Sequence, residues 1–321
     1  MNARILTTAT LAIAIAGVLP AKAADPQLLS LVMPDAKVLA GVNVDQAKTT
    51  PFGQYVLSQM QSQNLEMQKL EALTGFDPTR DVHELLVASN VANGATANDH
   101  TGLFLARGTF DSVKITAAAT AGGGITESYK SVTIVEDPKG THGVAFLDST
   151  LAIAGDVANV KGAIDRQGRA YPMPASLAVL VNKWSSTQDA WAITAVPPSS
   201  LHPPATAPSV PGMNGAGAFQ AIQSAAGGVK FGALVVVTAE AQADNADDAT
   251  QMGNALKMLA MLAQMQAAKE PAAAALAQSL QVSTSDSTLN VSVSLPEDLL
   301  QQVVKPKGNV RRADRPVIRH M

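Results

Sequence analysis

Four residues before residue 101 carry side chains that could form a metal site with hard ligands. Asp81, His83, Asp99 and His100 could meet across neighbouring strands. Carboxylate oxygens and imidazole nitrogens bind zinc and similar ions. No known ligand spacing requires these four residues to meet, so solvated strand and loop positions are the default interpretation.

Three methionines form a second candidate metal site. Met258, Met261 and Met265 fall on one side of a helix predicted over 244–269, and thioethers are soft ligands that suit cuprous copper. Methionine also fills gaps in cores and interfaces, and leucines alternate with these three residues. Packing in the core or against a partner is therefore favoured over copper binding, and no other cofactor is predicted.

None of the known catalytic motifs tested is complete in this sequence. His83-Glu84 begins like the helical motif of zinc proteases, but Val87 stands where that motif needs its second histidine. Neither Gly-x-Ser-x-Gly nor Ser-x-x-Lys occurs, and the glycine-rich segments 122–124 and 212–217 lack the context of a phosphate-binding loop. A function without catalysis is favoured. The rival hypothesis is a hydrolase of unfamiliar geometry that uses carboxylates with His83 or His142.

The first 23 residues have the pattern of a secretory signal peptide. Arg4 precedes the uncharged apolar stretch 5–18, and Ala21-Lys22-Ala23 provides small residues for cleavage. That stretch is shorter than the ~20 residues that span a bilayer. The mature protein is therefore expected to begin near Ala24, without a transmembrane span, and to work in the periplasm or outside the cell.

The composition is that of a globular protein that folds without covalent cross-links. Hydrophobic residues make up 47% and charged residues 15% of the chain, and cysteine is absent, which excludes disulfides and thiol chemistry. Without Arg4 and Lys22 the net charge falls from −3 to −5, while segment 305–321 carries +5 and the body 24–304 carries −10. An acidic body is unlike a nucleic-acid binder. The basic tail could contact acidic envelope surfaces or could simply be disordered.

Hydrophobic periodicity predicts an α+β protein with a mixed, mainly antiparallel sheet and packed helices. Loops are expected over 90–100 and 197–217. The predicted strands are 37–44, 84–89, 102–107, 129–136, 143–147, 151–154, 190–196, 230–238, 281–285 and 289–295. The predicted helices are 51–73, 111–121, 157–166, 176–184, 219–226, 244–269 with a continuation after Pro271 to 279, and 297–304.

Two similar hairpins suggest an internal duplication. Asp148-Ser149-Thr150-Leu151 recurs as Asp286-Ser287-Thr288-Leu289, each between two predicted strands. Upstream, helix 65–73 with strand 84–89 parallels helix 219–226 with strand 230–238. We therefore predict two related lobes, 24–170 and 171–304, between the signal peptide 1–23 and the tail 305–321. Turn chemistry alone could also place Asp-Ser-Thr twice.

The leader, Pro34-Asp35-Ala36 and the segment 75–81, Gly-Phe-Asp-Pro-Thr-Arg-Asp, together resemble uncharacterised bacterial exported proteins. The resemblance covers about the first half of the chain and implies only compartment and fold. The functional hypothesis is an exported binding or scaffolding protein of the cell envelope, whose partner is an envelope protein or a ligand. A methionine-based metal carrier is a further alternative to the hydrolase.

Overall fold

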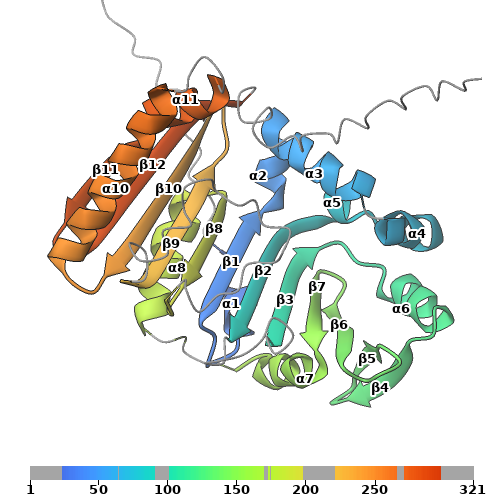
Figure 1. Ribbon diagram of the computed structural model, residues 1–321. Coiled ribbons are helices and arrows are strands. Elements are labelled where there is room, and N and C mark those ends of the chain that lie inside the picture. Colours follow the sequence, from blue (N-terminus) through green and yellow to red (C-terminus); the bar gives the residue numbers. More distant parts are fainter. Residues whose placement is uncertain are drawn as a thin grey trace, which may run out of the picture.

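The computed structural model describes residues 24–63, 65–90, 101–169, 173, 175–197, 221–265 and 271–297. These residues form one twelve-stranded sheet with helices on both faces, an α+β architecture (Figure 1). In the part of the chain so described, no helix combines the length and hydropathy needed to cross a bilayer.

Every strand pairing in the sheet is antiparallel, and the strand order is β11-β12-β10-β9-β8-β1-β2-β3-β7-β6-β5-β4. The strands are β1 (Val38–Asn43), β2 (Val82–Asn90), β3 (Thr101–Gly108), β4 (Ile125–Tyr129), β5 (Val132–Glu136), β6 (His142–Asp148), β7 (Leu151–Asp156), β8 (Ala190–Thr194), β9 (Ile222–Lys230), β10 (Leu234–Ala243), β11 (Gln281–Ser285) and β12 (Thr288–Pro296). β1 lies between β2 and β8, so one sheet runs through both predicted lobes. The boundary near residue 170 stays a prediction.

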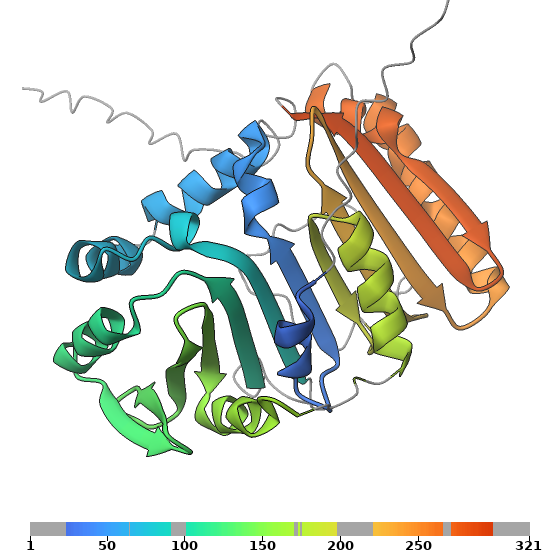
Figure 2. The ribbon, with the colours of Figure 1, turned by 180° about the vertical axis from the view of Figure 1, so that it is seen from behind.

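The helices lie along both faces and one end of this sheet (Figures 1 and 2). They are α1 (Pro26–Ser30), α2 (Val44–Lys48), α3 (Pro51–Gln63), α4 (Leu65–Thr74), α5 (Pro78–Asp81), α6 (Ser112–Ala121), α7 (Val157–Arg166), α8 (Ala175–Thr187), α10 (Ala246–Met265) and α11 (Pro271–Ser279). Figure 2 shows α1 and α8 on the face turned away in Figure 1, where α10 and α11 lie in front.

The main core lies under α1, α7 and α8. Leu39, Leu86, Leu105 and Ile153 point from neighbouring strands to this face and are fully buried. A smaller core fills the space between α10 and the opposite face of the last strands, where Met252 meets Leu289. Side chains alternate between the faces of a strand, so β10 and β12 turn every second residue to α10 and the others to the open face.

Most long predicted elements are confirmed. Helices α6, α7 and α8 and strands β1, β2 and β3 agree with their predictions to within a few residues. Gly75 has φ of +76° and its N–H bonds to the carbonyl of Glu71, as expected of a helix C-cap. Helix 51–73 divides into α3 and α4. Except for Pro197, Glu297 and Asn90, which ends β2, the predicted loops 90–100 and 197–217 and the predicted helix 297–304 lie outside the described residues.

The prediction of helix 219–226 was wrong, and the strand predicted over 230–238 is confirmed only from Leu234. Residues 222–230 form β9, and β10 begins at Leu234. β9 pairs with β8 on one side and with β10 on the other. Just after the predicted helix, a Cβ on Gly228 would lie 2.4 Å from Gln188 Cγ. Tertiary packing therefore overrides the local helix propensity here.

The strand predicted over 129–136 is a hairpin, because β4 and β5 are joined at Lys130-Ser131. Both residues have positive φ, +48° and +67°, as a tight hairpin turn requires. Such turns favour glycine and asparagine, so this pair gives almost no sequence signal.

The structure does not show the predicted duplication. In the first hairpin Asp148 pairs with Leu151, so Ser149-Thr150 form the turn. In the second, Ser285 pairs with Thr288, so the turn is Asp286-Ser287. The same four residues therefore occupy different places in the two turns, and the helix proposed as the second upstream repeat is part of β9.

Candidate functional site

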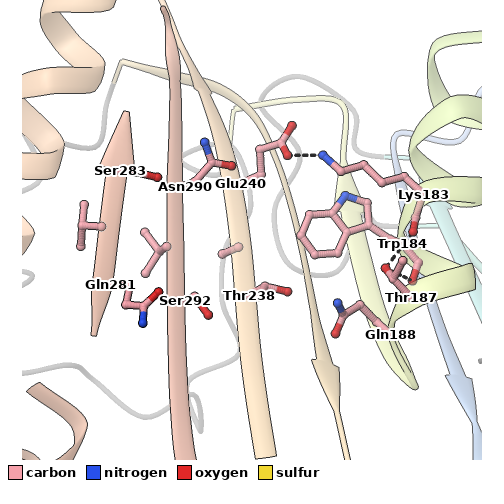
Figure 3. A pocket seen from close by; sticks show the side chains of 13 residues that line it. Lys183, Trp184, Thr187, Gln188, Thr238, Glu240, Gln281, Ser283, Asn290 and Ser292 are labelled. Atoms are coloured by element: carbon pink, nitrogen blue, oxygen red, sulfur yellow. Dashed lines mark hydrogen bonds and ion pairs between the residues drawn. The ribbon is translucent and has the colours of Figure 1, made fainter. Parts of the chain in front are cut away.

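A polar groove of about 680 Å³ lies on the open face of the last strands, beside α8 (Figure 3). α8 covers β8 and β9 on this face, and in Figure 2 no helix lies over β10 or β12 there. The floor is built from six polar side chains on β10, β11 and β12: Thr238, Glu240, Gln281, Ser283, Asn290 and Ser292. Strand alternation explains this set, because the residues between them face α10 or α11.

The wall of the groove comes from the last two turns of α8 and the residue that follows it. Trp184 is 5% exposed, and Thr187 and Gln188 lie beside it at the rim (Figure 3). Lys183 reaches across the groove to an ion pair with Glu240, and its ammonium lies 5.5 Å from the centre of the Trp184 ring. The helix and the sheet are therefore tied together at one end of the groove.

Polar atoms without partners gather at this groove. Among the residues described, five buried side-chain atoms lack a hydrogen bond, and three of them belong to groove residues: Trp184 Nε1, Gln188 Oε1 and Thr238 Oγ1. A buried polar atom without a partner costs about 1–3 kcal/mol. These three atoms lie beneath the surface of the groove, and the described residues provide no partner for them there.

A second hollow, of about 570 Å³, lies on the opposite face of the sheet between α6 and β5, β6 and β7. Its lining is mainly apolar, with Glu136 and His142 at the border. A hydrogen bond with Glu127 raises the pKa of Glu136, and a hydrogen bond with Lys161 lowers the pKa of Glu127.

The predicted hard-ligand metal site is not brought together by the described residues. Asp81 bonds to Arg80, at 2.7 Å, and to the N–H of Asp77. His83 Nδ1 lies 2.9 Å from Asp45 Oδ1 on α2. Asp99 and His100 lie outside the described residues. Across the described ranges, no group of three or more histidines and carboxylates could hold a metal ion.

The histidines named for the hydrolase hypothesis lie on separate strands. His83 is on β2 and His142 on β6, with β3 and β7 between them. His142 Nε2 lies 3.9 Å from Asp156 Oδ1, and its side chain is exposed. The structure therefore does not unite them in one site.

The three methionines lie on the outer surface of α10. Met258, Met261 and Met265 are 58%, 61% and 82% exposed, beside Leu262. They therefore do not pack in the core of this chain, where Met252 is buried instead. Packing against a partner, the other favoured alternative, and copper binding both stay predictions.

Sequence reasoning missed the groove residues altogether. The alternation of β12 was visible, but it was used to find the apolar side, Val291, Val293 and Leu295. The polar side, Asn290 and Ser292, carried the signal of the site. These polar residues form a groove only because β10 and β11 pair with β12, and a local sequence pattern does not predict that pairing.

Comparison with known proteins shows a fold but no function. No family model and no curated protein matches this chain. The chain is similar to crystal form III of TP0453, with a TM-score of 0.54 and 10% identity over 86% of this chain and 96% of that one. Crystal form IV of TP0453 gives 0.51 and 9%, over 87% and 96%. At these identities the likeness concerns the fold alone.

Proposed function

We propose that this protein is an exported binding protein of the cell envelope and that it holds its ligand in the polar groove. The observation that carries the proposal is the groove itself, in which polar side chains of β10, β11 and β12 gather beside the wall formed by α8. The volume of the groove, about 680 Å³, falls in the range of small-molecule sites. Export rests on the leader pattern of residues 1–23.

A thermal-shift screen of the mature protein tests the groove. A ligand at a concentration of about 100 Kd stabilises the folded state by about 2.7 kcal/mol, which raises Tm by about 5 °C for a chain of this size. We expect Ser292→Trp, which fills the centre of the groove, to abolish that shift.

Ser294→Trp is the matched control, because Ser294 lies on the same strand and the same face but outside the groove. It should keep the shift. Ligands that stabilise Ser292→Trp as well as the unaltered protein would contradict the groove as the binding site, as would a chemically broad library without any hit.

Export is tested by fractionating cells that express the full chain. We expect the protein outside the cytoplasm with Ala24 as its first residue, since Ala21-Lys22-Ala23 provides the cleavage site. Mass spectrometry of the purified protein measures this directly. An intact chain that retains Met1 and stays in the cytosol would overturn the envelope assignment.

A further inference from the structure

We infer that the polar groove binds a short, neutral oligosaccharide. This inference rests on the proposed function, because it names the ligand class of the same site. The floor offers hydroxyl groups on Ser283 and Ser292 and amide groups on Gln281 and Asn290. Each of these groups can both donate and accept. A sugar hydroxyl does the same, so the two sets of groups are complementary in kind.

The strand register arranges the floor into two rows that cross the strands. In one row Ser283 lies opposite Asn290, and Asn290 lies opposite Glu240. Neighbouring strands lie about 4.8 Å apart, so a polar group recurs at about that spacing along the row. Such a row can follow a ligand whose hydrogen-bonding groups are distributed along its whole length.

The second row runs parallel to the first and reaches the wall. Gln281 lies opposite Ser292, Ser292 opposite Thr238, and Thr238 opposite Gly228. The side chain of Gln188 covers Gly228, where a Cβ would lie 2.4 Å from Gln188 Cγ. The row therefore continues from the sheet onto the wall.

The charges of the groove cancel. Lys183 and Glu240 are the charged side chains of its lining, and they are paired with each other. An anionic ligand would meet Glu240 and a cationic one Lys183, and either would have to break that ion pair. A neutral ligand leaves the ion pair between Lys183 and Glu240 intact. The ring of Trp184, which is 5% exposed, forms an apolar part of the wall.

An extended peptide fits this surface less well. Sheets recognise peptide strands through free backbone groups at an edge. The floor of the groove lies on the faces of β10, β11 and β12, and the backbone groups of β10 and β12 bond to neighbouring strands on both sides. Free backbone groups are left only at the outer edge of β11, so the floor itself presents side chains.

The test measures binding of the mature protein to two sets of probes by calorimetry. One set holds neutral oligosaccharides of glucose, galactose, mannose and N-acetylglucosamine, and the other holds uncharged peptides of similar length. We expect at least one oligosaccharide to bind. Asn290→Ala should weaken that binding about tenfold, the effect of about 1.4 kcal/mol from a lost hydrogen bond.

Ser285→Ala is the control, because Ser285 lies on β11 beyond the groove and is exposed. It should bind as the unaltered protein does. Binding of peptides alone, weakened by Asn290→Ala, would overturn the saccharide inference and leave the groove as a binding site. If a sugar binds equally well to Asn290→Ala, to Ser292→Trp and to the unaltered protein, it binds outside the groove, and the saccharide inference is overturned as well. No binding from either set would also overturn it, and the thermal-shift screen then decides whether the groove binds anything.

Discussion

Replacing Gly155 with alanine is expected to destabilise the protein by about 3 kcal/mol or more. Gly155 has φ of +144°, a conformation that L side chains rarely adopt. A Cβ at this position would also lie 2.2 Å from the carbonyl oxygen of Gly102 on the neighbouring strand. Strain and overlap add, because the centre of the sheet cannot move away without breaking the pairing of β3 with β7. Urea denaturation measures the loss as a lower midpoint.

Gly102→Ala is the matched control for this prediction. The two glycines lie against each other, but a Cβ on Gly102 would have only the carbonyl oxygen of Ala88 nearby, at 4.0 Å. We expect a change within about 0.5 kcal/mol, typical of a substitution without strain. Equal losses for both variants would mean that the effect comes from glycine in a strand in general and not from the geometry of Gly155.

The sequence predicted the elements whose pattern is local. β1, β2 and β3 followed from alternating hydrophobic residues, and α7 followed from helical spacing, because each buries one face against the same core. The failure at β9 has the opposite cause. β9 is a strand because it pairs with β8 and β10, and these partners lie outside the window in which a local pattern can be recognised.

The candidate site was harder to predict than the fold. The polar residues of β10, β11 and β12 read separately as the solvated sides of three strands. They become a groove because the register sets Asn290 beside Ser283 and Glu240, and because α8 ends beside them. Which strands pair with one another depends on residues far apart in the sequence. A local pattern therefore predicts neither the register of these strands nor the position of α8. The hard-ligand candidates were chosen by side-chain type alone, and the two that the structure describes have other partners: Asp81 bonds to Arg80, and His83 lies beside Asp45.

Asp189→Ala is expected to cost about 3 kcal/mol of stability, as the loss of one partner of a buried ion pair does. The side chain of Asp189 is fully buried, and its oxygens accept hydrogen bonds from Lys230 Nζ and from the N–H of Phe231, both at 2.7 Å. Alanine leaves both donors without this acceptor. Lys230 is partly exposed, so water recovers some of its loss, which places the cost at the lower end of the range. Thermal and urea unfolding measure the difference.

Lys230→Met separates the ion pair from the backbone contact. If the pair carries most of the effect, Asp189→Ala should cost less in a Lys230→Met background, with a coupling energy of at least about 1 kcal/mol in a double-mutant cycle. Additive losses would assign the cost to the N–H of Phe231 alone. Either contact fixes the start of β8 to the end of β9, directly after Gln188. Gln188 lies over Gly228 at the groove. We therefore expect Asp189→Ala to weaken ligand binding as well as to destabilise the fold. Gly102→Ala, which lies far along the sheet, should leave ligand binding unchanged.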